Sequence, residues 1–131
     1  MNRLDLNAFV RAYVDCLLWC SLLDTGDPDA SDNPSPYDAG FSADDLAPDD
    51  FATMRERAVS FAWTNRRLLR DAIGASGYSM EQAGHDLALT EQRHGAGFWD
   101  RGLGPVGDAL TAATDSVDSL FWDDDGTLRL M

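Results

Sequence analysis

The chain has 131 residues, of which 44% are hydrophobic, and its 23 acidic side chains outnumber 10 basic ones, all of them arginine. This length predicts one domain over residues 1–131 with a core of its own, and the hydrophobic share excludes a wholly disordered chain. The net charge of −13 repels phosphate, so direct binding of nucleic acid is disfavoured.

Residues 4–23 are predicted to form a buried helix, because their apolar side chains recur at helical spacing in two strips. Cys16 and Cys20 lie four apart on one face and are interpreted as small buried apolar groups. The apolar run 16–23 is too short to cross a membrane. We therefore expect no signal peptide, no membrane span and a cytoplasmic location.

Residues 24–41 are rich in aspartate, proline and glycine and hold few large apolar groups. Their turn signals, such as Gly-Asp-Pro and Asn-Pro, predict a long acidic loop without regular structure. The segment Ser42–Asp45 resembles a capping box and predicts a short turn before Pro48.

Residues 48–73 predict the longest helix. Pro48 suits the first helical position, and Asp49 and Asp50 follow in the first turn, where the helix dipole favours negative charge. Apolar residues then form a stripe at i, i+3 and i+4 spacing, with arginines off the stripe, and Gly74 and Gly77 end the helix.

The rest of the chain predicts two further helices and a hairpin. The expected elements are a helix over 80–93 capped by Ser79 and Gln82, a glycine-rich loop over 95–104, a short helix over 105–117, and a hairpin over 120–130 that turns at Asp124-Asp125-Gly126. The predicted fold is therefore mainly α (α+β). It is a small helical domain of about four helices with a C-terminal two-stranded β-hairpin and a long acidic loop.

The most distinctive local sequence is Gly84-His-Asp-Leu-Ala-Leu-Thr90, followed by His94-Gly-Ala-Gly-Phe-Trp-Asp-Arg-Gly102. Over residues 78–104 the chain resembles a family of small, uncharacterised proteins of phages and other mobile elements. Those proteins typically read Gly-His-Asp-Phe-Trp-Leu-Thr-Arg and then His-Gly-Ala-Gly-Phe-Trp-Asp-Arg-Gly. Leu87 and Ala88 stand where the family has aromatic residues. The resemblance implies a mobile-element origin and no particular chemistry.

This block allows three interpretations: a metal or acid–base site, a structural motif, or a contact with a partner. A metal or acid–base site would use His85, Asp86, Glu91, His94 and Asp100. A structural motif would comprise His85, Asp86, His94, Phe98, Trp99, Asp100 and Arg101, in which Asp100 pairs with Arg101 and the two aromatic side chains fill the core. We favour the structural motif and expect no catalytic residue, no metal and no cofactor.

Clustered aspartates point to a function that depends on charge. Duplex DNA carries about one negative charge per 1.7 Å of its axis, so carboxylates along one face can occupy a basic cleft built for DNA. With the implied origin, this favours an inhibitor of a host nucleic-acid-binding defence complex, of anti-CRISPR or antirestriction type, that acts as a DNA mimic. The predicted partner-binding residues are Asp44, Asp45, Asp49, Asp50, Asp123, Asp124 and Asp125.

Three alternatives remain open at this point. The acidity is also typical of a solvated surface in a protein from a GC-rich or salt-adapted genome. The block over 85–100 is compatible with a small metal- or ligand-binding protein. A virion or plasmid accessory protein, in which the charge is incidental, is the third.

Overall fold

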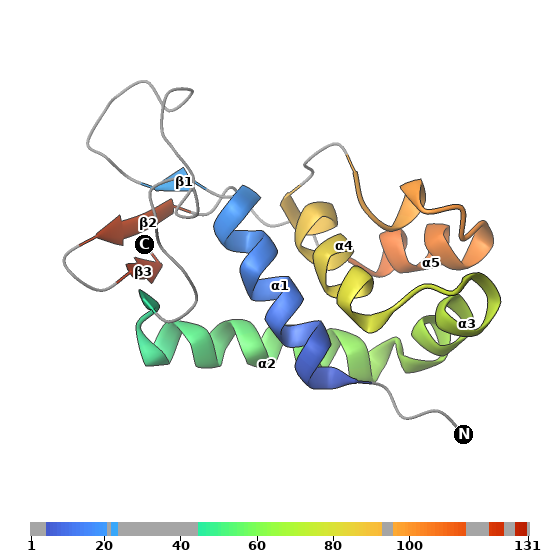
Figure 1. The fold of residues 1–131 in the computed structure, drawn as a ribbon, viewed down its shortest axis with the longest axis horizontal. Coiled ribbons are helices and arrows are strands. Elements are labelled where there is room, and N and C mark those ends of the chain that lie inside the picture. Colours follow the sequence, from blue (N-terminus) through green and yellow to red (C-terminus); the bar gives the residue numbers. More distant parts are fainter. Residues whose placement is uncertain are drawn as a thin grey trace.

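The computed structural model describes residues 5–20, 22–23, 45–92, 96–114, 121–124 and 128–130. Figure 1 shows α1 between a small sheet and α4, with α2 along one side of the molecule. The elements are α1 (Leu6–Cys20), β1 (Leu22–Leu23), α2 (Pro48–Thr64), α3 (Arg66–Ser76), α4 (Met80–Gln92), the 3₁₀ helix η3 (Phe98–Asp100), α5 (Pro105–Ala113), β2 (Phe121–Asp124) and β3 (Leu128–Leu130).

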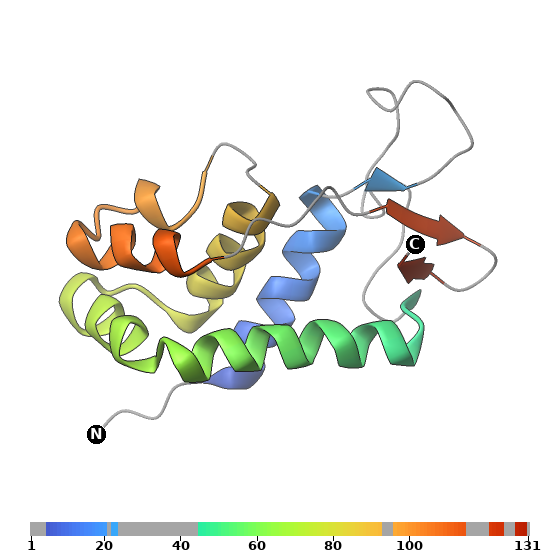
Figure 2. The ribbon, with the colours of Figure 1, turned by 180° about the vertical axis from the view of Figure 1, so that it is seen from behind.

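The core forms where α1 packs against α4 and α2, as Figures 1 and 2 show from opposite sides. Phe9, Tyr13 and Leu17 of α1 are fully buried, which confirms a buried first helix. Glycine at position 84 permits the crossing of α1 and α4. A Cβ at Gly84 would meet the carbonyl oxygen of Phe9 and lie 2.9 Å from the Cβ of Ala12.

Three aromatic rings connect α1, α2 and η3. The ring of Phe61 on α2 stacks on Phe9 at a centroid distance of 6.5 Å and on Phe98 at 5.8 Å. Offset stacking of this kind adds about 0.5–1.5 kcal/mol per pair to the burial of apolar area. The glycine-rich segment before α5 is thereby attached to the core through Phe98.

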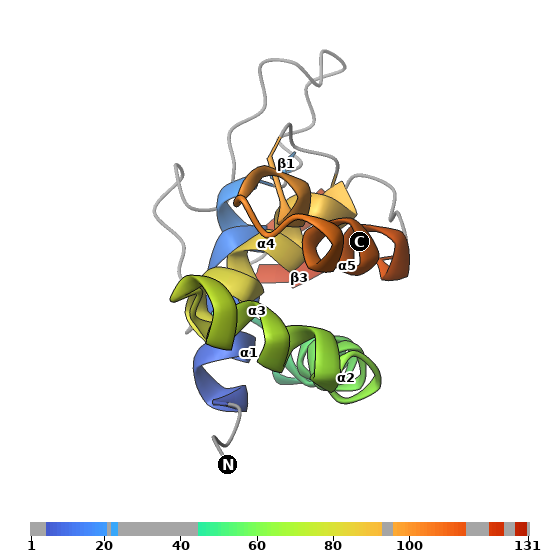
Figure 3. The ribbon, with the colours of Figure 1, turned by 90° about the vertical axis from the view of Figure 1, so that its right-hand side faces the viewer.

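The single long helix predicted over 48–73 is wrong, because the chain turns at Asn65. The backbone of Asn65 has φ −108° and ψ 23°, which departs from helical values. Its side-chain amide donates to the carbonyl oxygen of Phe61 at 3.0 Å, so the side chain offers the backbone an alternative to continued helix. α2 therefore ends at Thr64 and α3 begins at Arg66. Figure 3 views the molecule from the end where α3 and α5 are in contact.

Both ends of the α3–α4 connection follow the sequence signals. Of the two glycines predicted to end this helix, Gly77 does so: it adopts the left-handed conformation (φ 65°) that commonly follows a last helical residue, whereas Gly74 lies within α3. The hydroxyl of Ser79 accepts a hydrogen bond from the backbone N–H of Gln82 at 3.0 Å, which confirms Ser79 as the N-cap of α4.

The predicted fold of about four helices with a C-terminal two-stranded hairpin is wrong on both counts. Because the helix breaks at Asn65, the part of the chain whose side chains are described contains five α-helices. The chain near the C-terminus forms no separate two-stranded unit. β2 pairs in parallel with β1 (Leu22↔Phe121) as well as antiparallel with β3, so the strands form a mixed three-stranded sheet. Residues 22–23 leave the first helix, where the prediction had placed them, and supply β1.

Several predictions fall partly outside the described residues. Cys16 is buried as expected, whereas nothing is described of the Cys20 side chain. The acidic loop 24–41, the segment 42–44 and the end of the predicted helix 105–117 also lie outside the described ranges. No described helix has both the length and the apolarity needed to span a bilayer.

Candidate functional site

Two buried carboxylates on α4 organise the polar interior of the molecule. Asp86 is 0% exposed and Glu91 is 7% exposed. They are five residues apart, so they leave α4 on different faces and engage different partners. Because an unpaired buried charge is strongly unfavourable, each carboxylate needs a cationic partner and further hydrogen bonds.

Asp86 is held by three side chains. The Nε of Arg101 donates to Oδ1 at 2.9 Å, Gln82 Nε2 donates to the same oxygen at 3.1 Å, and the Tyr78 hydroxyl donates to Oδ2. Burial, followed by the hydrogen bond to Asp86 and its negative charge, raises the pKa of Tyr78 far above its usual value. The phenol therefore keeps its proton and serves as a permanent donor.

The expected pairing of Asp100 with Arg101 is wrong. Arg101 forms its ion pair with Asp86, and Asp100 is exposed at the end of η3. Asp86 is fully buried, so its charge has the greater need of a cation. Arg101 thus connects the loop after η3 to the middle of α4.

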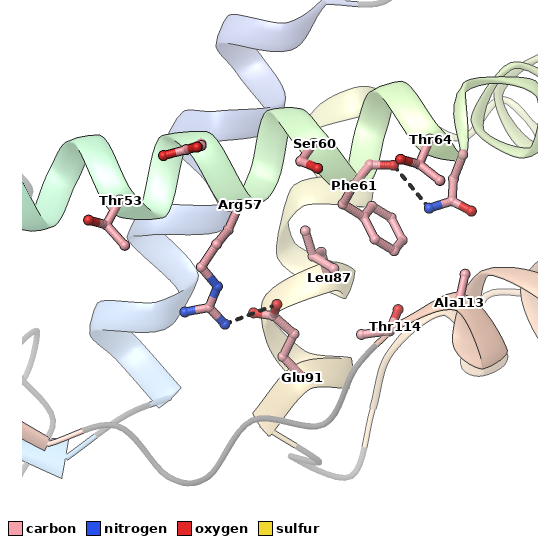
Figure 4. Close-up of a pocket in the computed structure, with 11 residues that line it drawn as sticks. Thr53, Arg57, Ser60, Phe61, Thr64, Leu87, Glu91, Ala113 and Thr114 are labelled. Atoms are coloured by element: carbon pink, nitrogen blue, oxygen red, sulfur yellow. Dashed lines mark hydrogen bonds and ion pairs between the residues drawn. The ribbon is translucent and has the colours of Figure 1, made fainter.

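Glu91 is the centre of the second cluster, and Figure 4 shows its contact with Arg57. The hydroxyl of Tyr13 donates to Oε1 at 2.6 Å, and Arg57 of α2 donates to Oε2 at 3.3 Å. The cluster therefore connects α1, α2 and α4 by charge-assisted hydrogen bonds.

A pocket of about 580 Å³ opens beside this second cluster, between α2, α4 and the end of α5. Arg57, Glu56 and Glu91 supply its charged groups, while Phe61 and Leu87 supply apolar surface. Its hydroxyl-bearing lining residues are Thr53, Ser60, Thr64 and Thr114. Such a lining can hydrogen-bond a small polar molecule. None of the described lining residues is the histidine or cysteine expected of a Ser–His or Cys–His pair.

The distinctive block is built into the fold through one of its two aromatic residues. Phe98 is fully buried, as expected, but Trp99 is 44% exposed and does not fill the core. The backbone N–H of Phe98 donates to the hydroxyl of Thr90 at 3.3 Å. A Cβ at Gly97 would collide with that hydroxyl and with the Trp99 ring, so glycine is required there by close packing.

The described residues form no cluster of ligand side chains that would suit the metal-site alternative. Asp86 and Glu91 are engaged in separate ion pairs. His85 is half-buried on α4, and His94 lies outside the described ranges. Among the residues that the structure describes, no group of three or more His, Cys, Asp or Glu side chains is positioned to hold a metal ion.

The predicted partner-binding aspartates that the structure describes belong to elements at one end of the molecule. Asp45 and Asp49 are exposed and Asp50 is half-buried, at and just before the first turn of α2. Asp123 and Asp124 belong to β2, which Figures 1 and 2 draw at the same end. Asp44 and Asp125 lie outside the described residues.

Sequence reasoning missed Arg57, Tyr13 and Trp63. The hydrogen bonds of Glu91 to Tyr13 and Arg57 span 78 and 34 residues of sequence, so no local pattern could indicate them. The sequence did contain a signal for Trp63. It lies four residues after Val59 and eleven after Ala52, which places all three on the side of α2 opposite the apolar stripe.

Comparison with known proteins found no matching family model, curated protein or solved structure.

Proposed function

We propose that the chain is a phage- or mobile-element-encoded acidic protein that inhibits a host nucleic-acid-binding defence complex, of anti-CRISPR or antirestriction type, by DNA mimicry. The part that binds is the anionic surface, defined as Asp45, Asp49 and Asp50 at the start of α2, together with Asp123 and Asp124 in β2 and their sequence neighbours Asp44 and Asp125. Each carboxylate would accept a hydrogen bond from an arginine or lysine of the complex.

The observation that carries the proposal is how the arginines are distributed. The described residues form two side-chain ion pairs, Arg57–Glu91 and Arg101–Asp86, and both involve a buried carboxylate. Each pair is neutral, so the net charge of −13 resides on the other groups of the chain. The exposed Asp49 has no arginine partner among the described residues. A basic receptor would therefore meet the unpaired charge of Asp49 on a strongly negative chain, which accelerates association and favours the correct partner.

The separation of charges along α2 also supports the proposal. Asp49 lies in the first turn of α2, while Arg66 and Arg67 follow its last residue. At 1.5 Å per residue the two groups are about 25 Å apart. That distance exceeds the Debye length of about 8 Å at physiological ionic strength. A cationic cleft can thus approach the anionic surface with little repulsion from these arginines.

The test is competition with DNA. The purified protein is titrated into complexes of labelled duplex DNA with host restriction enzymes and with host CRISPR effectors, at several salt concentrations. We expect displacement of the DNA from at least one of them, with an affinity that falls as salt rises. The variant Asp45→Asn/Asp50→Asn should displace DNA at least tenfold less well, and its circular dichroism and thermal unfolding are measured alongside to establish that it is folded.

The matched control is Glu81→Gln/Asp108→Asn. Both residues are exposed carboxylates in the first turns of α4 and α5, so the control removes the same amount of charge from other helix starts. It should compete nearly as well as the unmodified protein. Equal losses in the two variants, competition independent of salt, or no displacement from any of these complexes would each overturn the proposal.

A further inference from the structure

Trp63 on α2 is the most exposed of the large hydrophobic side chains described, at 66%. The guanidinium of Arg66 lies 4.5 Å from the centre of its ring and donates to the carbonyl oxygen of Trp63 at 2.9 Å. The arginine thus covers one face of the indole and keeps it at the surface. Tryptophan and arginine are the residue types most enriched at the energetic centres of protein interfaces.

Trp63 ends a continuous stripe on the outer side of α2. Ala52, Glu56, Val59 and Trp63 follow one another at spacings of four, three and four, which places them on one face of a helix. The opposite face, formed by Met54, Ala58 and Ala62, is buried in the core. A shallow, mainly apolar hollow of about 410 Å³ lies over the stripe, with Arg55 and Ser60 at its edges.

We propose that this stripe is the two-fold contact of a homodimer, in which two copies of α2 pack antiparallel. Closed dimers use the same patch on both copies, so the patch has to be complementary to itself. In the antiparallel arrangement Trp63 of each copy lies over Ala52 of the other, which sets a large side chain against a small one. Arg66, stacked on Trp63, then faces Asp49 of the second copy, one turn before Ala52.

The order of charges along α2 selects a second copy as the occupant and sets its direction. A parallel pair would place Asp49 against Asp49 and Arg66 against Arg66, which is unfavourable. A nucleic acid drawn to Arg66 and Arg67 would be repelled by the net charge of −13. In an antiparallel pair, the second copy places its Asp49 against Arg66 of the first copy and its Arg66 against Asp49 of the first copy.

We expect a weak, reversible dimer. A contact made through one helix face buries less than the roughly 800 Å² per partner that is typical of stable complexes. The two copies also repel each other by their net charge and by Glu56, which this register places near the two-fold axis in both copies. The inference is independent of the proposed function, because it is measured without any host protein. Asp49 is the one residue shared with the anionic surface.

Sedimentation equilibrium over a wide range of protein concentration tests the dimer. We expect a monomer–dimer equilibrium, with at least a tenfold weaker association for Trp63→Ala. Trp99→Ala is the matched control, since Trp99 is also substantially exposed but lies in η3, and it should associate as the unmodified protein does. A protein that stays monomeric up to about 1 mM would overturn the proposal.

Charge exchange tests the antiparallel direction. Asp49→Arg and Arg66→Asp should each be monomeric alone, because like charges then face each other at both ends. An equimolar mixture of the two variants should form a dimer with one copy of each, since every exchanged charge now faces its opposite. Misfolding of a variant cannot produce this recovery on mixing. Asp108→Arg, in the first turn of α5, should dimerise normally, and a mixture that stays monomeric would contradict the antiparallel contact.

Discussion

The hydroxyl of Tyr13 on α1 donates a 2.6 Å hydrogen bond to the buried carboxylate of Glu91 on α4, across 78 residues of sequence. Arg57 of α2 donates to the other oxygen of the same carboxylate. Three helices that are distant in sequence therefore depend on one charged group. Because the local dielectric constant is low, such a network has large energetic consequences when one member is removed.

Tyr13→Phe removes the hydroxyl and leaves the aromatic ring. We expect unfolding free energy to fall by about 1.5–3 kcal/mol, the range for hydrogen bonds to charged groups. Urea denaturation measures this. A double-mutant cycle with Glu91→Ala should show coupling above about 0.5 kcal/mol, because the two side chains are in contact. Strict additivity would contradict the hydrogen bond.

Asp86→Ala should be among the most destabilising single substitutions of a polar residue. It removes the common acceptor of Arg101, Gln82 and Tyr78. Breaking a buried ion pair from one side typically lowers unfolding free energy by about 3–5 kcal/mol. Asp100→Ala is the control, since Asp100 is exposed and should change stability by no more than about 0.5 kcal/mol. Similar effects of the two substitutions in urea denaturation would refute this assignment.

Two glycines in helices should respond to alanine with opposite signs. Gly84→Ala forces a Cβ into the backbone of α1 at Phe9, so we expect destabilisation of about 1–3 kcal/mol. A Cβ at Gly74 in α3 meets nothing within 4 Å, and alanine there should add about 0.4–1 kcal/mol of stability. Thermal unfolding midpoints of the two variants compare them directly, and a midpoint for Gly84→Ala at or above that of the unmodified protein would exclude the close contact.

The raised pKa of Tyr78 predicts that the folded protein loses stability at alkaline pH. In the unfolded chain its phenol ionises near pH 10, whereas in the folded protein burial and Asp86 keep it protonated to higher pH. The folded state therefore binds one more proton above about pH 10, and its stability falls as pH rises further. Below about pH 10 the phenol is protonated in both states, so the contribution of Tyr78 to stability is fully present. In Tyr78→Phe, urea midpoints between about pH 9 and 11 should decline less steeply than in the unmodified protein. Parallel declines would show that Tyr78 is not responsible.

Periodicity and capping signals predicted where most helices begin, because these are local features. Ser79 and Pro48 mark helix starts as expected, and the buried face of α1 follows from its apolar pattern. The break at Asn65, whose side-chain amide is bonded to Phe61, was missed because asparagine occurs within helices as well as at their ends.

The candidate site was less predictable than the helices. Asp86 and Arg101 were both named from the sequence, but Arg101 was paired with its neighbour Asp100. Its true partner is 15 residues away and becomes available only when η3 packs on α4. Burial decides which carboxylate receives the arginine, and burial depends on the tertiary fold.

Because α1 and α4 cross closely at Gly84, α1 can complete its packing only after α4 has been synthesised. α1 is synthesised before α4, the helix that covers much of its apolar surface, and residues 21–79 lie between the two. Closing such a long loop adds only a modest entropic penalty. The delay is kinetic: at roughly 5–20 residues per second, several seconds pass before α4 is available. During that interval α1 exposes its apolar side chains, to which a chaperone can bind.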